Sequence, residues 1–374
     1  MPAENSVYKI KDSVDLFLSN GSYITAYYMN TRRRKSFKVN AEMIHLLEEI
    51  DGVKTLSELC ETMKSYGISP ENVKSVINLM VKNKIVTEIV KDKSVLTEDE
   101  KLKYSRQINY FSEFLDGEAA GEIAQKKILT AKVVIFGCGA IGGNIALELA
   151  MAGVSNFTLY DYDIVEESDA ARHMFFRQEY LNLPKVAALS KEIKLINPRA
   201  EIISVNEEML PSSEIEKIIC GSDIVINTLD EPYIGYTSAK ISRVCMKYKI
   251  VHYIAGGFDA HLASTGELII PFVTPCVECY AGHFKKTLAG WKPEKHPVQA
   301  RFNEIGGLAC MSLFSTSYAC IEILKFLAGL TDINESYKTR GEFLFTNMEL
   351  TYLNVEKNPA CPVCGKEKNF EAET

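Results

Sequence analysis

The chain has 374 residues, of which 47% are hydrophobic, 24% charged and 10% aromatic, and its formal net charge is −7. This composition is typical of an ordinary soluble globular protein that is long enough for two domains. The net negative charge argues against a general nucleic-acid binder.

Residues 1–92 are predicted to form a domain of their own. Asn20-Gly21, a strong hairpin signal, stands between two strand-like segments, Asp15–Leu18 and Ser22–Tyr28. A third strand is predicted at Phe37–Val39, directly after a basic run. Three helices follow, at Ala41–Ile50, Leu56–Tyr66 and Pro70–Lys84. The intervening residues 51–55 predict a turn, in which Gly52 ends one helix and Thr55 caps the next.

This order of strands and helices resembles the winged-helix, PqqD-like domain of enzymes that modify ribosomally made peptides. The resemblance implies that a precursor peptide binds as an added strand beside the third strand and against the third helix. A generic wing or dimerisation domain is the alternative. Residues 93–103 are charged and polar, and we interpret them as a linker to a second domain at 104–374.

A nucleotide site is predicted where an apolar strand, Lys132–Phe136, runs into the glycine-rich turn of residues 137–142. A helix at Asn144–Met151 and a strand at Asn156–Tyr160 follow, and the strand ends on Asp161. Glycines let backbone N–H groups approach a phosphate, the helix N-terminus favours an anion, and an acid after the second strand binds a ribose hydroxyl. Taken alone, this pattern most often indicates a nicotinamide or flavin site.

Alternating strands and helices continue to about residue 270, which predicts an α/β fold with a doubly wound, mostly parallel, Rossmann-like sheet. The further strands are expected at Glu201–Val205, Ile224–Thr228, Ile250–Ile254 and Gly266–Pro271. Ligands bind beyond the carboxyl ends of such strands, where Asp161 and Asp230 are expected to lie.

The segment after Asp161 carries the decisive motifs, because Asp161-Tyr162-Asp163-Ile164-Val165 is followed by Arg172 and then by Pro184-Lys185. A dehydrogenase has no need of these two cations. The layout resembles the ThiF/MoeB/MccB family of ubiquitin-activating-type adenylating enzymes, and it is closest in kind to the members that make microcin C and pantocin A.

The resemblance implies ATP and Mg²⁺ as cofactors, with Arg172 and Lys185 on the phosphates, Asp230 on the metal and Asp161 on the ribose. The other residues that it assigns to the nucleotide are Gly137, Gly139, Ala140, Gly142, Asp163 and Asp169. It also implies a homodimer, since the arginine matching Arg106 in Tyr104-Ser105-Arg106-Gln107 reaches the γ-phosphate in the partner subunit. Asp169 and His173 depart from the family pattern, which has asparagine and glutamine there, and a carboxylate near the α-phosphate would repel it.

Two Cys-x-x-Cys pairs, Cys276/Cys279 and Cys361/Cys364, predict a tetrahedral structural zinc site that ties the C-terminal segment to the domain. A redox pair is the alternative. The chain has ten cysteines and no N-terminal segment of signal-peptide type, so we expect reduced thiols and a cytoplasmic protein. The apolar window Leu308–Leu330 contains polar and charged residues and is expected to be a buried helix, not a membrane span.

No cysteine lies between about residues 281 and 307, where related enzymes carry an acyl-accepting thiol. The cysteines outside the zinc motif are expected to be buried, and Cys310 is the one worth testing for a catalytic role. His283 and His296 are candidate general bases, with a surface role as the alternative.

The sequence therefore predicts a homodimeric enzyme that adenylates a carboxylate of a ribosomally synthesised precursor peptide. Cyclisation, cross-linking or nucleotidylation of that peptide would follow. One alternative is activation of a ubiquitin-like sulfur-carrier protein, and another is a non-catalytic partner that presents a precursor to a cyclodehydratase. No nucleic-acid or membrane partner is expected.

Overall fold

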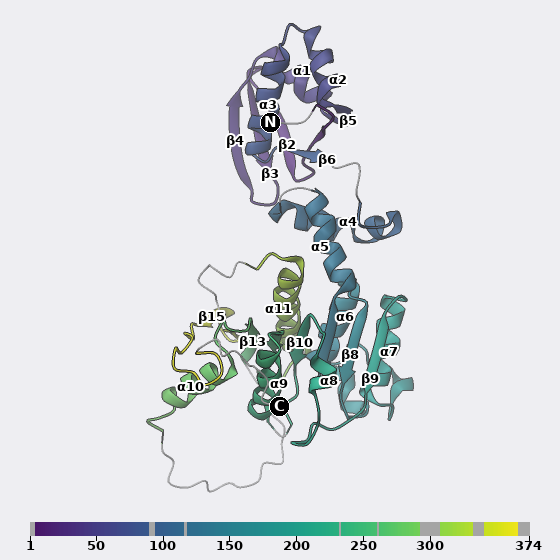
Figure 1. The fold of residues 1–374 in the computed structure, drawn as a ribbon, viewed down its shortest axis with the longest axis vertical. Helices are drawn as coiled ribbons and strands as arrows, with labels where there is room; N and C mark the ends of the chain where they lie inside the picture. Colours follow the sequence, from purple (N-terminus) through teal and green to yellow (C-terminus); the bar gives the residue numbers. More distant parts are fainter. Residues whose placement is uncertain are drawn as a thin grey trace. The chain divides into compact units, whose positions relative to one another are not determined.

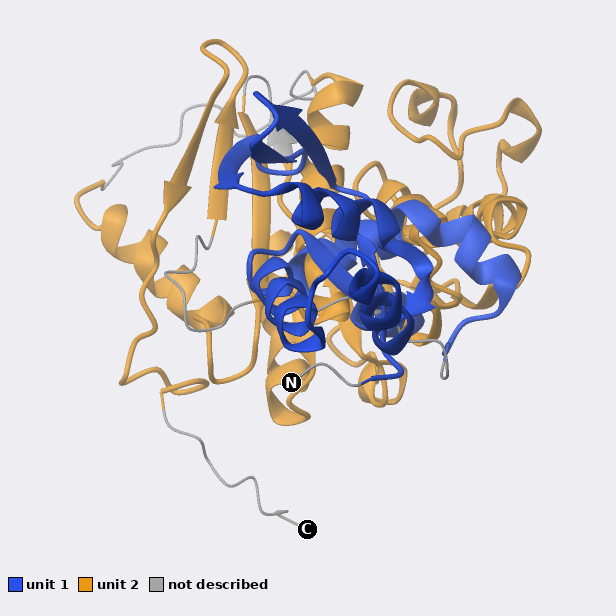
Figure 2. Cartoon of the chain, turned by 90° about the horizontal axis from the view of Figure 1, so that it is seen from above, with its two compact units in different colours: residues 1–126 blue, residues 127–374 orange. Residues whose placement is uncertain are grey.

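The computed structural model describes residues 4–89, 94–115, 118–231, 233–259, 262–291, 307–331 and 340–365. The chain divides into two compact units, residues 1–126 and residues 127–374 (Figure 2). Helix α5 (Glu118–Thr130) runs across the division.

The first unit contains two three-stranded antiparallel sheets. One has the order β5 (Asp51–Thr55), β1 (Val7–Ile10), β6 (Val86–Ile89), and the other has the order β2 (Val14–Ser19), β3 (Tyr23–Tyr28), β4 (Arg33–Lys38). The β2–β3 hairpin is confirmed, and Asn20 and Gly21 both adopt the left-handed backbone conformation at its turn.

Three helices of this unit confirm the prediction from apolar periodicity: α1 (Ala41–Glu49), α2 (Leu56–Lys64) and α3 (Pro70–Lys82). Each begins at a polar residue whose side chain accepts a backbone N–H bond, namely Asn40, Thr55 and Ser69. Buried Leu46, Leu56 and Ile77 belong to the core that joins the helices to the sheets. A further helix, α4 (Glu98–Phe114), starts with a capping box at Thr97, so residues 98–103 of the charged segment are helical.

Two predictions for this unit were wrong. The segment at Asp51–Thr55 is strand β5 rather than a plain turn, because it pairs with β1, whose short sequence gave no signal. Strand β4 begins at Arg33 rather than Phe37, so it includes the basic run. Pairing with β3 extends a strand that composition alone would have ended.

The second unit is built on a nine-stranded sheet with a parallel centre, which confirms the predicted α/β class (Figure 1). Its parallel strands are β11 (Val251–Ile254), β10 (Ile224–Asn227), β7 (Lys132–Phe136), β8 (Asn156–Tyr160) and β9 (Glu201–Val205), in that order. The antiparallel extension continues from β11 through β13 (Leu262–Ile269), β14 (Arg340–Leu344) and β15 (Glu349–Leu353), and β12 (Phe258–Asp259) pairs with β13.

The direction of the chain reverses between β7 and β10. From β7 the strands proceed to β8 and β9, and from β10 they proceed the opposite way to β11. Right-handed crossovers therefore place the connecting helices on opposite faces of the sheet. One group consists of α6 (Gly142–Ala152), α7 (Lys185–Ile196) and α11 (Ala309–Ala328), and the other of α8 (Glu216–Ile219), α9 (Ile234–Lys247) and α10 (Val277–Thr287). The gap at the reversal, between the ends of β7 and β10, is where such sheets bind ligands.

The antiparallel part of the sheet was not predicted correctly. Strand β13 starts at Leu262 rather than Gly266 and runs against β11, and β14 and β15 were missed. Helix α11, by contrast, confirms the predicted buried helix, since it packs against α6 and β13. Among the described residues it is the single helix long and apolar enough to cross a membrane, but Ser312, Ser315 and Thr316 on its buried side mark it as a core helix.

Candidate active site

The glycine turn after β7 is held in a conformation that few other residues tolerate. Gly137 has a positive φ of 91°, and a Cβ atom on Gly142 would lie 2.0 Å from the carbonyl oxygen of Gly137. No heavy atom lies within 4 Å of the place where a Cβ atom of Gly139 would stand. The turn therefore folds tightly upon itself and leaves its outer side open at Gly139 and the half-buried Ala140.

Asp161 ties the end of β8 to this turn. Its carboxylate accepts hydrogen bonds from the backbone N–H of Cys138 at 2.6 Å and of Asp163 at 2.8 Å. Burial raises the pKa of Asp161, and the two N–H donors oppose that change. Each carboxylate oxygen keeps a second lone pair, so the geometry leaves an acceptor for a ribose hydroxyl.

Lys185, the first residue of α7, lies against Asp163. Its Nζ atom is 2.9 Å from Oδ2 of Asp163, and only 10% of the Lys185 side chain is exposed. Burial opposes the charged form, but the hydrogen bond to Asp163 and the nearby charges outweigh it and raise the pKa of Lys185. Lys185 therefore keeps a positive charge at neutral pH.

Backbone bonds close the base of the segment that carries Arg172. Lys185 N–H donates to the carbonyl oxygen of Asp163 at 2.8 Å, and Val165 N–H donates to that of Leu183 at 2.8 Å. Ile164 and Pro184 form the antiparallel bridge between these bonds. Residues 165–183 are thereby held as a closed loop beside β8.

Asp169 is buried within this loop and contacts both residues that follow it in the motif. Its Oδ1 atom lies 3.4 Å from Nη2 of Arg172 and 3.3 Å from Nε2 of His173. Burial lowers the pKa of His173 to about 4, so its contact with Asp169 is not an ion pair at neutral pH. These contacts give Asp169 a structural role inside the loop.

Asn144 of α6 was missed by the sequence analysis. It is fully buried, its amide donates to the carbonyl oxygen of Arg172 at 3.1 Å, and its own oxygen accepts from Met174 N–H at 2.9 Å. Asn144, on the helix that follows the glycine turn, thus forms hydrogen bonds to the backbone on both sides of His173. The available signal was a polar residue in the first turn of a helix whose other residues, apart from Glu148, are small or apolar.

Asp230 lies in the exposed loop that follows β10, as expected. Its neighbour Glu231 accepts a hydrogen bond from the hydroxyl of Tyr162, which follows β8. Strand β7 stands between β8 and β10, so this bond joins the loops on either side of the glycine turn. The structure joins Asp161, Asp163 and Lys185 through hydrogen bonds and joins Asp169 to Arg172, and Asp169 is close enough to Lys185 for their charges to interact. Asp230 lies on the adjoining loop.

The four cysteines of the two Cys-x-x-Cys pairs converge, and all are buried. Cys276 Sγ lies 3.6 Å from Cys361 Sγ, Cys279 Sγ lies 3.4 Å from Cys364 Sγ, and all four sulfur atoms lie within 4.8 Å of one another. Tetrahedral zinc with Zn–S bonds of about 2.3 Å needs sulfur atoms about 3.8 Å apart. The cluster therefore fits a zinc ion, and it joins the start of α10 to residues 361–364.

The remaining site predictions divide into three groups. Arg106 lies on the exposed face of α4, in the first unit, where it lines a cavity of about 280 Å³ with Lys9 and Lys11. His283 is on α10, and His296 lies outside the described residues. The prediction that the other cysteines are buried was wrong for Cys220, which ends the short helix α8, and for Cys310, near the start of α11, because both are exposed.

Comparison with known proteins decides the family. The model of the ThiF family matches residues 104–363. The chain belongs to the ThiF family. Membership makes it an ATP-dependent adenylyltransferase, as the motifs predicted. The sulfur carrier protein ThiS adenylyltransferase of Escherichia coli is 25% identical over 267 residues, which are 71% of this chain and 95% of that protein.

Two solved structures share the fold over nearly the whole chain, including the first unit. Escherichia coli MccB with AMPCPP and MccA superposes with a TM-score of 0.70 at 17% identity, covering 96% of this chain and 99% of that one. PaaA superposes with a TM-score of 0.69 at 19% identity, covering 93% of this chain and 100% of that one. The shared fold therefore extends beyond the residues that match the ThiF model.

Proposed function

We propose that this ThiF-family enzyme adenylates a carboxylate of a ribosomally synthesised precursor peptide, in the biosynthesis of a peptide natural product of the antibiotic kind. The observation that carries the proposal is the combination of two features in one chain. The loop beyond β8 and the start of α7 hold two cations, Arg172 and Lys185, at the edge of the sheet where such folds bind nucleotides. A separate N-terminal unit has an edge strand, β4, at which a peptide would pair.

In the proposed reaction a carboxylate oxygen of the peptide attacks the α-phosphorus of ATP, and pyrophosphate leaves. Arg172 and Lys185 would neutralise the phosphate oxygens on which negative charge develops, and Asp230 would hold the Mg²⁺ ion that ATP brings. Lys185 would exchange its contact with Asp163 for one with phosphate, and Asp161 would accept from the ribose. The glycine turn, open at Gly139, would receive the nucleotide.

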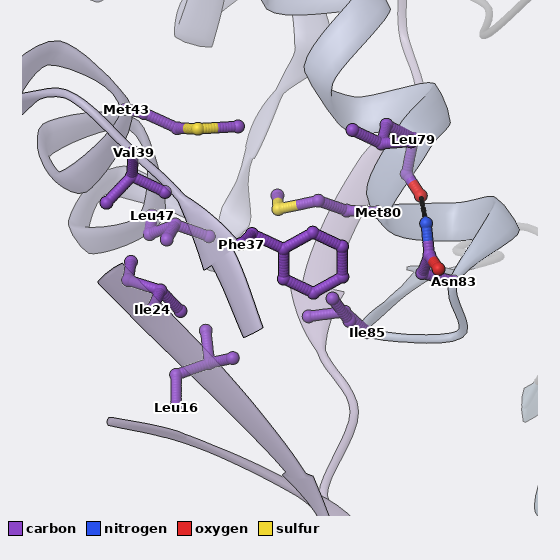
Figure 3. A pocket seen from close by; sticks show the side chains of 10 residues that line it. All are labelled: Leu16, Ile24, Phe37, Val39, Met43, Leu47, Leu79, Met80, Asn83 and Ile85. Atoms are coloured by element: carbon purple, nitrogen blue, oxygen red, sulfur yellow. Dashed lines mark hydrogen bonds between the residues drawn. The ribbon is translucent and has the colours of Figure 1, made fainter. Parts of the chain in front are cut away.

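The acyl adenylate would then react without an enzyme thiol. A nitrogen or carbon nucleophile of the same peptide would displace AMP, which gives a cyclised or cross-linked product, and a nucleotidylated peptide is a further outcome. The E. coli structures hold MccB with MccA. We extend that combination to this chain because its first unit supplies an edge strand beside an apolar pocket (Figure 3).

We further propose that the active form is a cytoplasmic homodimer. Arg106 would contribute to the nucleotide site of the partner subunit, since its guanidinium is exposed on α4 and suits bidentate contact with phosphate oxygens. The zinc ion would be structural: all four cysteines would be ligands, so no coordination position would remain for a substrate.

Activation of a sulfur-carrier protein is the second candidate, favoured by the similarity to the ThiS adenylyltransferase over 95% of that protein's length. Residues 1–103, the greater part of the first unit, lie outside the residues that match the ThiF model and have no evident role in that reaction. A non-catalytic presenter of precursors is less consistent with the retained cations Arg172 and Lys185.

The proposal is tested by measuring release of pyrophosphate from ATP by the full-length protein. The substrates compared are a short peptide encoded beside its gene and a ThiS-type carrier protein. We expect pyrophosphate release with the peptide and none with the carrier protein. The mass of the peptide should change by the loss of water or by the gain of a nucleotidyl group. Release with the carrier alone would establish the second candidate. Nucleotide binding without turnover of any substrate would indicate the presenter.

A further inference from the structure

The edge of β4 in the first unit combines an open strand with a concentration of positive charge. Among the described residues β4 pairs on one side only, with β3. Its six residues are Arg-Arg-Lys-Ser-Phe-Lys, so four carry a positive charge and none a negative one. An exposed edge of this kind accepts a further strand through backbone hydrogen bonds.

The charges on β4 are not neutralised within the unit. Lys35 donates to the side-chain oxygen of Asn83 at 3.1 Å, and Arg34 lies over the ring of Tyr27 at 5.6 Å. In the described part of the chain, no acidic side chain forms an ion pair with Arg33, Arg34, Lys35 or Lys38. The surplus of cations is therefore available to a ligand that brings its own negative charge.

An apolar pocket adjoins the same strand (Figure 3). Phe37 of β4 points into a small cavity that Met43 of α1 and Leu79 of α3 also line. Met43 and Leu79 also line a wider groove of about 1040 Å³ between α1 and α3. Leu79 is 46% exposed and lies beside the buried Met80 and the other apolar residues of the apolar pocket, which leaves an apolar surface for another apolar group. The charged residues that line this wider groove are Lys38, Lys82 and Glu42.

We propose that the occupant of this surface is an acidic peptide, which adds a strand to β4 and places one large apolar side chain against Phe37, Met43 and Leu79. The inference rests on the proposed function, which requires a peptide, and adds the chemistry that this chain selects. Aspartate and glutamate side chains flanking the apolar residue would meet the cations of β4 and Lys82. The backbone bonds supply affinity for any extended peptide, and the charges supply selectivity.

Nucleic acid would also be attracted by these cations, but the groove favours a peptide. Aliphatic and thioether side chains, among them Val39, Met43, Val76 and Leu79, line the wider groove beside one aromatic ring, Tyr66, whereas single strands of nucleic acid are bound by several aromatic rings on which successive bases stack. A nucleotide chain also lacks the peptide N–H and C=O groups that would pair with the open edge of β4.

The test is a selection of random-sequence displayed peptides on the full-length protein in the absence of ATP. We expect the enriched peptides to share a net negative charge and one leucine, isoleucine, methionine or phenylalanine. Affinity, measured by fluorescence anisotropy with the synthesised winner, should fall about tenfold when its acids become amides, and should weaken as salt is raised. An enriched set that is neutral or basic would overturn the inference. So would tighter binding of a single-stranded RNA oligonucleotide.

Matched variants separate the surface from general effects on the protein. Lys38→Glu combined with Lys82→Glu should weaken the selected peptide at least tenfold, whereas Lys64→Glu on α2, outside the groove, should not. Leu79→Ala should weaken it, whereas Val81→Ala, at a similarly exposed position on the same helix but outside the groove, should not. Equal effects of test and control variants would contradict the placement.

The outcome is distinguishable from failure of the proposed function. Selective binding of acidic peptides without ATP turnover of any substrate would leave this inference intact and remove the proposed reaction. Turnover of a precursor peptide that binds equally well after its acids are neutralised would support the proposed reaction and overturn this inference. Selection of no peptide at all would overturn the inference.

Discussion

The ammonium group of Lys185 lies 2.9 Å from a carboxylate oxygen of Asp163, with most of the Lys185 side chain buried. The two residues belong to segments that are also joined through their backbones, because Lys185 N–H donates to the carbonyl oxygen of Asp163. The positive charge is thus held at the end of β8, beside the glycine turn, by the fold itself. An incoming phosphate would find this charge already positioned.

Replacement of Lys185 by methionine tests this arrangement. Lys185→Met retains much of the stem but removes the charge that would meet the phosphates. We expect peptide-dependent pyrophosphate release to fall about 100-fold to 1,000-fold. Lys194→Met, an exposed lysine near the end of the same helix, is the control and should leave the rate unchanged. Calorimetric titration with a non-hydrolysable ATP analogue separates lost binding from lost chemistry. A Lys185→Met enzyme with the wild-type rate would refute the assignment.

Asn144 is predicted to position the loop that carries Arg172. Asn144→Ala removes two buried hydrogen bonds and leaves their backbone partners unsatisfied, which should cost about 1–3 kcal/mol in the free energy of unfolding. Pyrophosphate release should fall as well, because the backbone of Arg172 is no longer anchored. Asn144→Asp keeps the acceptor for Met174 N–H but places a buried carboxylate oxygen against the carbonyl oxygen of Arg172, so it should lower both stability and rate at least as much as Asn144→Ala. If neither changes the rate, the positioning role is wrong.

Glu267 is expected to make stability depend on pH. It is buried on β13, and burial raises its pKa to about 7, although Arg340, at 3.3 Å, opposes that change. The folded state therefore binds a proton at this group more tightly than the unfolded state does. Its contribution to stability is fully present below about pH 4.5, is lost as pH rises to about 7, and stays constant beyond that value.

The measurement is urea unfolding of the wild type and of Glu267→Gln across this range. The difference in unfolding free energy, wild type minus variant, should fall by about 3 kcal/mol between pH 4.5 and pH 8. The glutamine variant isolates this group from buried histidines, whose contributions change in the opposite direction and cancel in the difference. A difference that is independent of pH would show that Glu267 is ionised in both states.

The four-cysteine cluster predicts one bound zinc ion per chain. Removing it with a strong chelator should lower the melting temperature, because the metal joins α10 to residues 361–364. Cys361→Ser should lower both metal content and stability. Cys310→Ser, an exposed cysteine outside the cluster, should change neither of these, and it should also leave pyrophosphate release unaltered. Full activity and stability in a metal-free protein would exclude a structural zinc site.

Sequence patterns predicted those parts of the fold that are determined by interactions between residues close together in the chain. The helices α1 to α3, the Asn20-Gly21 hairpin and the strand–glycine turn–helix unit each have signals within a few neighbouring residues. Strands β5, β14 and β15 do not, because pairing with distant strands makes them extended. The sequence predicted that the two cysteine pairs share one metal site, because two Cys-x-x-Cys motifs together supply the four thiolates of a structural zinc site.

The candidate site was predictable in its residue types and not in its contacts. The motif spacing indicated Arg172 and Lys185, but nothing in it indicated that Asp163 would hold Lys185 or that Asn144 would hold the Arg172 backbone. Those pairings depend on how α6 and the loop of residues 165–183 meet in three dimensions. The contacts of Asp169 with Arg172 and His173 likewise required the folded loop.

The central claim is that a peptide carboxylate is joined to AMP, and isotope transfer tests it most directly. A substrate peptide whose carboxylates carry oxygen-18 is incubated with ATP and the enzyme, and the nucleotide and phosphate products are analysed by mass spectrometry. The account predicts that AMP gains one labelled oxygen for each carboxylate activated, because AMP leaves with an oxygen from the peptide. Label in inorganic phosphate with ADP as co-product, or turnover of ATP with no label in AMP, would contradict it.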